Sequence, residues 1–149
     1  MLRLFKHNKP NIALFIFLLA FFAALINLNI ISVYKNFDRG DYFNILTINS
    51  ILAGFLFTGL GVLLSSLDRK STARLEAGGY LDKYYLAIYI AIFFNMLGIV
   101  SSIVVIFNTF PLIDIYLTYV VQLATIAGVI FFIKSMNGLR KIINKMRNS

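Results

Sequence analysis

Apart from Asp114 near one end of the fourth stretch, the polar side chains inside the long apolar stretches of this chain are neutral amides and hydroxyls. Asn95 lies in the third such stretch, and Thr118, Gln122 and Thr125 share one face of the fourth at helical spacing. These groups donate and accept hydrogen bonds, and they carry no charge near neutral pH. Inside a membrane they suit two roles: hydrogen bonds between neighbouring helices, or the lining of a water-filled path.

Apart from the single carboxylate of Asp114, these stretches contain no histidine, cysteine, lysine or acidic residue for acid–base, nucleophilic or metal chemistry. The single histidine, His7, lies in the basic N-terminus, and the chain has no cysteine. It also has no pair of membrane-embedded carboxylates and no glycine-rich phosphate-binding motif. We therefore expect a protein that is not an enzyme and that uses neither a cofactor nor a metal ion.

Four apolar segments position these side chains and make up most of the 149 residues. Each has 22 or 23 residues, enough for a helix to cross the ~30 Å hydrocarbon core of a bilayer. None shows the period-2 alternation of a barrel strand. The sequence thus predicts an all-α integral membrane protein, a four-transmembrane-helix bundle that forms a single membrane domain over residues 1–149. The predicted spans are 12–34, 45–67, 86–108 and 112–133.

Basic residues are distributed unevenly over the gaps between these spans. Residues 1–11, 68–85 and 134–149 hold 12 of the 14 lysines and arginines, and the opposite side holds only Lys35 and Arg39. The positive-inside rule then places both termini in the cytoplasm of a bacterial cell (inner) membrane. The net charge of +8 suits anionic lipid headgroups, and we do not expect nucleic-acid binding.

Small residues recur at helical spacing along the first three spans and predict faces that approach other helices closely. In the second span they fall within an arc of about 80° and form what we call the small-residue face: Thr47, Ser50, Gly54, Thr58, Gly61 and Ser65. Gly59 points away from this face, toward lipid or a looser contact. The third span carries Ala87, Ala91, Asn95, Gly98 and Ser102, and the first carries Ala13, Ala20, Ala24 and Asn27.

Two pairs of amides are expected to meet across helices. If the third and fourth helices are antiparallel neighbours, Asn95 and Gln122 both lie near the membrane midplane, and Asn27 and Asn49 lie at similar depths in the first two spans. Hydrogen bonds within each pair would hold the bundle together. The alternative for Asn95 and Gln122 is a polar constriction or water-lined path.

Two segments outside the spans have recognisable patterns. Residues 139–147 predict a basic amphipathic helix lying on the inner leaflet, with charged side chains from Arg140, Lys141, Lys145 and Arg147. In the middle loop, residues 73–77 predict a short helical turn. This loop is either a solvated connector or a surface for a cytoplasmic protein partner.

The run Ile48 to Gly61 reads INSILAGFLFTGLG and is followed by a charged loop and two further spans. It resembles the small four-span membrane components of bacterial anti-phage defence systems, such as those of the Kiwa type. The resemblance implies a homo-oligomeric sensor or scaffold subunit that signals infection to a cytoplasmic partner, or a membrane effector. The alternative function is a small oligomeric channel or pore.

The orientation can be tested with reporter fusions. A cytoplasmic reporter fused at Ser149 should be active, and one fused at Asp41 should behave as external, because 12 of 14 basic residues lie on the side of the termini. The reverse pattern would overturn the predicted topology.

Overall fold

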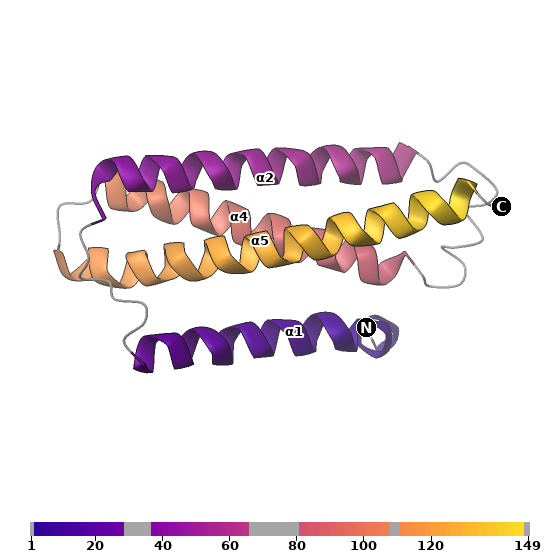
Figure 1. Ribbon diagram of the computed structural model, residues 1–149, viewed down its shortest axis with the longest axis horizontal. Helices are drawn as coiled ribbons and strands as arrows, with labels where there is room; N and C mark the ends of the chain where they lie inside the picture. Colours follow the sequence, from indigo (N-terminus) through magenta and orange to yellow (C-terminus); the bar gives the residue numbers. More distant parts are fainter. Residues whose placement is uncertain (1, 29–36, 66–80, 108–110, 148–149) are drawn as a thin grey trace.

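The computed structural model describes residues 2–28, 37–65, 81–107 and 111–147, and its regular elements there are all α-helices (Figure 1). They are α1 (Leu2–Asn27), α2 (Arg39–Ser65), α4 (Asp82–Phe107) and α5 (Pro111–Arg147). Each contains a stretch long and apolar enough to cross a membrane. The predicted all-α, four-span architecture is confirmed. The predicted turn at 73–77 and the end of the first span lie outside the described residues.

The first residues of α2 and α5 explain where these helices begin. The Asp41 amide donates to Asp38 Oδ1 at 2.9 Å, and the Asp38 amide donates to Asp41 Oδ2 at 3.1 Å. This reciprocal pair satisfies backbone donors that the first turn leaves unpaired, as a capping box does. In α5, Pro111 occupies the first helical position, where its missing N–H costs nothing.

Helix α5 is longer than any predicted span. Its 37 residues extend about 55 Å at ~1.5 Å per residue, and it continues through Gly138 without a break. Residues 139–147, predicted as a basic amphipathic helix, therefore continue α5 and do not form a separate helix. Ile142, only 3% exposed, packs into the same core cluster as Leu63 of α2 instead of turning to lipid.

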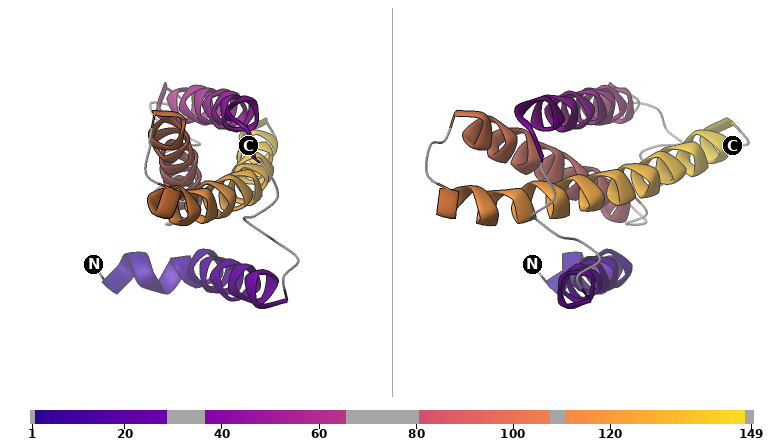
Figure 2. Two further views of the ribbon diagram at one scale, coloured as in Figure 1. Left: turned by 90° about the vertical axis from the view of Figure 1, so that its left-hand side faces the viewer. Right: turned by 60° about the vertical axis from the view of Figure 1, so that its left-hand side comes forward.

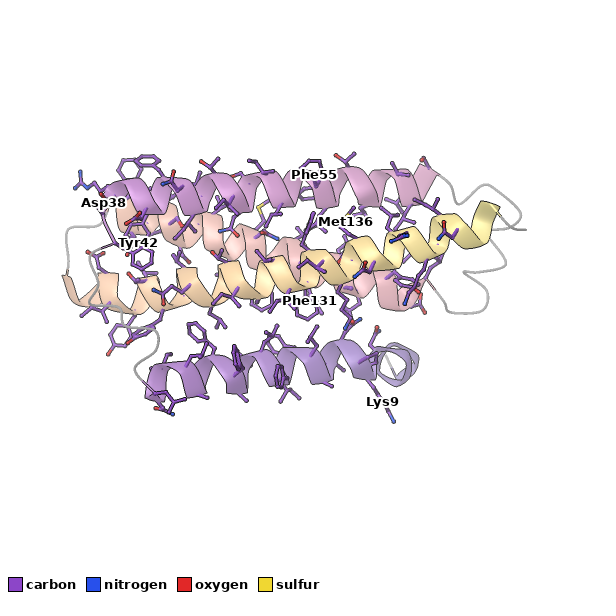
Figure 3. All side chains as sticks on the ribbon, in the orientation of Figure 1. Lys9, Asp38, Tyr42, Phe55, Phe131 and Met136 are labelled. Carbon is purple, nitrogen blue, oxygen red and sulfur yellow. The ribbon has the colours of Figure 1, made fainter. Side chains whose placement is uncertain are left out.

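Helices α2, α4 and α5 form the core, and α1 packs against one side of this core (Figures 1 and 2). Helix α4 packs against both α2 and α5, whereas α1 packs against α4 and α5. Helices α2 and α5 run in the same direction, and α4 runs opposite to both. The start of α1 and the end of α5 lie at the same end of the bundle, which we call the basic end. Lys9 lies at the basic end, and Asp38 lies at the opposite end (Figure 3).

Aromatic rings join α1 to the core. Phe94 of α4 lies 5.8 Å from Phe15 of α1 and 6.3 Å from Phe131 of α5, measured between ring centroids. Phe94 and Phe131 are both buried. Such tilted and stacked ring pairs contribute packing area across three helices. The opposite side of α1 exposes large apolar side chains such as Phe17 and Phe21, as expected of a lipid-facing surface.

The small residues of α4 are all buried, which confirms the close-packing face predicted for the third span: Ala87, Ala91, Asn95, Gly98 and Ser102. Gly98 allows a close approach of α2, because a Cβ there would lie 2.7 Å from Asn49 Nδ2. The small residues predicted for the first span do not lie against the rest of the chain: Ala13, Ala20 and Ala24 are exposed. Larger residues, Leu18 and Phe22, form the buried side of α1 instead.

The close contact at Gly98 gives a stability prediction. Gly98→Ala should lower the free energy of unfolding by ~1–3 kcal/mol, because the new methyl group overpacks against the amide of Asn49. The matched control is Gly54→Ala, since a Cβ at Gly54 meets nothing within 4 Å. That variant should be neutral or slightly stabilised by better helix propensity. Thermal unfolding in detergent measures both, and equal effects would contradict the close α2–α4 contact.

Candidate functional site

A polar seam joins α2 to α5 near the end opposite the basic end. Tyr42 Oη lies 2.6 Å from Thr118 Oγ1, and Asn49 Nδ2 donates to Thr125 Oγ1 at 3.0 Å. Both pairs are separated by 76 residues, so the two helices run parallel and in constant register. The pairs are seven residues apart, about 10 Å along the helices. We refer to these four residues as the α2–α5 polar seam.

The threonines of the polar seam also bond to their own helix. Thr118 Oγ1 donates to the Asp114 carbonyl at 2.7 Å, and Thr125 Oγ1 donates to the Val121 carbonyl at 2.8 Å. A hydroxyl has one hydrogen, so each threonine oxygen is left as an acceptor toward α2. Tyr42 is therefore the donor to Thr118, as Asn49 is to Thr125. The donor–acceptor order is the same in both pairs.

The amide pairs predicted from the sequence do not form. Asn95 Nδ2 donates to the Ala91 carbonyl of its own helix at 2.7 Å, and neither Asn95 Oδ1 nor Gln122 Oε1 has a hydrogen-bond partner. Thr118 and Thr125 of the polar stripe of α5 bond to α2, not α4. Asn27 is exposed while Asn49 is fully buried, because α1 packs on α4 and α5 and not beside α2 as a hairpin partner.

The buried amides are packed against glycine backbone. Asn49 lies against Gly98, and Asn95 lies against Gly128, where a Cβ would come within 3.0 Å of Asn95 Oδ1. Both asparagines are 0% exposed. At these two levels the space between the helices is filled by direct contact, and the arrangement favours hydrogen bonding and packing over a water-lined path.

The small-residue face of α2 lies on the outside of the bundle. All six of its residues are exposed, and a Cβ at Gly54 or Gly61 meets nothing within 4 Å. The buried side of α2 is the opposite one: Tyr42, Asn49, Ala53, Leu56 and Leu63. Gly59 was expected to point toward lipid or a looser contact, and it lies on the side of α2 that faces α5. A Cβ added at Gly59 would lie 3.6 Å from Leu139 Cδ2.

Hydroxyl groups on the small-residue face are satisfied by their own helix. Thr47, Ser50 and Thr58 each donate to the carbonyl four residues earlier at 2.8 to 2.9 Å, and Ser65 donates to the Val62 carbonyl at 2.9 Å. Because these hydroxyl hydrogens are already bonded to carbonyl groups, no unpaired donor is buried when lipid or another helix covers them. The hydroxyl groups of this face are thus already paired.

The basic residues predicted for the membrane surface lie at the basic end of α5. Arg140 and Lys141 are exposed. Lys145 and Arg147 belong to the same helix, and their side chains lie outside the described residues. Lys134, six residues before Arg140 on the same helix, was not predicted from the sequence as a membrane-surface residue. It donates to the Pro10 carbonyl of α1 at 3.2 Å.

A double-mutant cycle tests the polar seam. Asn49→Leu and Thr125→Val should show a coupling free energy of ~0.6 kcal/mol, up to ~1.7, because they remove the two ends of one hydrogen bond. Asn95→Leu and Gln122→Leu should show no hydrogen-bond coupling. Unfolding free energies in detergent give both values. Stronger coupling for the second pair would mean that α5 is rotated toward α4.

Comparison of the chain with protein-family models, with curated proteins and with solved structures finds no match. The resemblance to four-span anti-phage components therefore depends on residues 48–61 and the span pattern alone.

Proposed function

We propose that this chain is a non-enzymatic membrane subunit of the sensor or scaffold type, which assembles into homo-oligomers and signals to a cytoplasmic partner. The observation that carries the proposal is the exposed small-residue face of α2. Lipid tails fill small-residue grooves poorly, whereas a second helix fills them well, so such faces drive helix association in membranes. The occupant we propose is the same face of a second copy, because a two-fold axis joins identical surfaces.

Charge distribution supports the direction of signalling. The described basic residues Lys9, Lys134, Arg140 and Lys141 lie toward the basic end, whereas Arg39 lies beside Asp38 and Asp41 at the other end. Under the positive-inside rule the basic end faces the cytoplasm of the inner membrane. A partner that binds this end is positioned to respond to changes in the oligomer. A role in anti-phage defence, implied by the resemblance of residues 48–61, is part of the same proposal.

The alternative is a small oligomeric channel or pore. Its sequence support was the polar stripe of α5, and two residues of that stripe are bonded to α2 in the polar seam. Gln122 of that stripe is half-buried, and its enclosed Oε1 has no hydrogen-bond partner. Conductance in planar bilayers separates the two functions, since the scaffold gives no discrete openings and a pore does.

Leucine substitutions test assembly through α2. Gly54→Leu and Gly61→Leu should lower oligomer formation about tenfold, since overpacking costs ~1–3 kcal/mol, and should leave the fold intact because both sites are open. Gly59→Leu should instead destabilise the single chain against Leu139. Crosslinking yield and thermal unfolding, measured on all three variants, separate assembly from folding.

A matched control comes from α1, whose exposed alanines form a second small-residue surface. Ala20→Leu should leave assembly unchanged. If it abolishes crosslinking while Gly54→Leu does not, the oligomer forms through α1 and the proposal for α2 is wrong. The absence of native cysteine makes a direct test simple: Ser50→Cys should form an intermolecular disulfide, and Ile103→Cys, exposed on α4, should not.

A further inference from the structure

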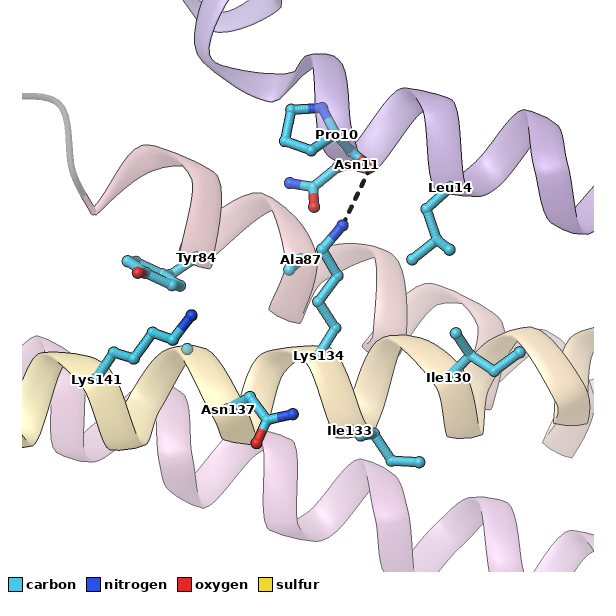
Figure 4. A pocket seen from close by; sticks show the side chains of 11 residues that line it. Pro10, Asn11, Leu14, Tyr84, Ala87, Ile130, Ile133, Lys134, Asn137 and Lys141 are labelled. Atoms are coloured by element: carbon cyan, nitrogen blue, oxygen red, sulfur yellow. Dashed lines mark hydrogen bonds between the residues drawn. The ribbon is translucent and has the colours of Figure 1, made fainter.

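A cavity of about 520 Å³ opens between α1 and the pair α4 and α5, toward the basic end of the bundle (Figure 4). Its volume lies within the range of small-molecule sites. Three helices contribute: Asn11 and Leu14 come from α1, Tyr84 from α4, and the remaining wall comes mostly from α5. This site is separate from the polar seam and from the small-residue face of α2.

The wall formed by α5 changes in polarity along the bundle. Ile130 and Ile133 are followed by Lys134, then by Asn137, then by Lys141. From Ile130 to Lys141 the helix rises about 16 Å, from the membrane interior toward the basic end. The wall formed by α1 has the same order in the same direction, because Leu14 lies on the interior side of Asn11. Both walls thus pass from apolar to polar along the membrane normal, as a phospholipid does.

Two lysines supply positive charge to this cavity. Figure 4 shows Lys134 reaching from α5 toward α1 and Lys141 extending toward the ring of Tyr84. Lys134 Nζ also lies 5.7 Å from the centroid of the Phe131 ring, so two contacts fix its position. The Pro10 carbonyl accepts one of its three N–H donors and does not neutralise its charge. Among the described residues, no carboxylate lines the cavity.

We propose that this cavity binds one anionic phospholipid, with its phosphate near Lys134 and Lys141 and the start of its acyl chains against Leu14 and Ile130. Basic pockets between transmembrane helices on the positively charged side are suited to anionic headgroups. A free phosphate would use the lysines but not the apolar half of the wall. A zwitterionic lipid would fill the space but would leave the two ammonium groups without a net negative partner.

Bound lipid would bridge α1 to α5. The Phe15 ring contact and the Lys134 hydrogen bond connect α1 to the core, and the cavity lies beside them. A phosphate between the two lysines and an acyl chain against Leu14 would add contacts on both sides. Lipid binding is independent of assembly through α2, because the two surfaces are on different helices.

The test measures lipid retained by the purified full-length chain. The protein is reconstituted in nanodiscs of phosphatidylcholine with a minor fraction of phosphatidylglycerol, released, and analysed by native mass spectrometry. The parent should retain phosphatidylglycerol in preference to phosphatidylcholine. The double variant Lys134→Gln, Lys141→Gln should reduce that retention about tenfold or more, since each basic residue near anionic lipid contributes ~1 kcal/mol.

Two further variants separate this cavity from the charged surface around it. Arg140→Gln removes one positive charge, half of what the lysine pair loses, from a neighbouring exposed position that does not line the cavity, and it should change retention less than about twofold. Ile133→Trp keeps both lysines and narrows the apolar part of the cavity from its exposed rim, and it should reduce retention. Helix content and thermal unfolding are recorded for each variant, so that loss of lipid is compared only among folded proteins.

Three results would overturn the proposal. Equal retention of phosphatidylglycerol and phosphatidylcholine by the parent would mean that charge does not select the lipid. An effect of Arg140→Gln as large as that of the lysine pair would place binding on the general basic surface. Displacement of the lipid by millimolar glycerol 3-phosphate would identify the ligand as a free phosphate compound. Retention that survives glycerol 3-phosphate and falls only in the cavity variants supports the lipid.

Discussion

The close approach of α4 to its two neighbours is the contact on which the rest of the bundle depends. Gly98 admits the amide of Asn49 from α2, and Gly128 of α5 admits the amide of Asn95 from α4. In lipid there is little hydrophobic driving force between helices, so association relies on such direct packing. A methyl group at Gly98 would force the Asn49 amide to shift, and one at Gly128 would press against the Asn95 amide. The backbones are close enough for short polar side chains to be fully enclosed.

The polar seam follows from this close packing. With α4 packed against both of them, α2 and α5 run parallel, and their residues at a constant separation of 76 face each other. Asn49 is held by Gly98 on one side and reaches Thr125 on the other. Hydrogen bonds of this kind add modestly to stability in membranes, but a stranded donor in the interior costs more. The polar seam therefore serves mainly to fix the register of α2 against α5, and it adds little to the free energy of unfolding.

The same arrangement determines which surfaces are left for other molecules. Because α2 turns Asn49 and Leu56 inward, its small-residue face must point outward, on the opposite side of the helix. Because α1 packs on α4 and α5, the start of α1 and the second half of α5 enclose a cavity with two lysines. The outward face suits another helix, and the cavity suits a ligand with a charged and an apolar part. The proposed assembly surface on α2 and the proposed lipid site both depend on the packing of α4 against α2, α5 and α1.

The sequence by itself determined the elements of this protein. Segment length and hydropathy predicted four membrane-spanning helices, and the spacing of Ala87, Ala91 and Gly98 predicted the buried face of α4, because periodicity fixes which residues share a side of a helix. The Asp38–Asp41 cap was also readable, as an acidic pair three residues apart, although its role was missed.

Only the tertiary structure decided which helix meets each face. Periodicity names no partner, so Asn95 and Gln122 were paired from their depth alone, whereas the observed bonds link α2 to α5. The small residues of α1 and α2 looked like those of α4, yet they lie exposed. The continuation of α5 past Gly138 also depended on a neighbour, because Ile142 is buried only where Leu63 and the rest of the core are present to cover it.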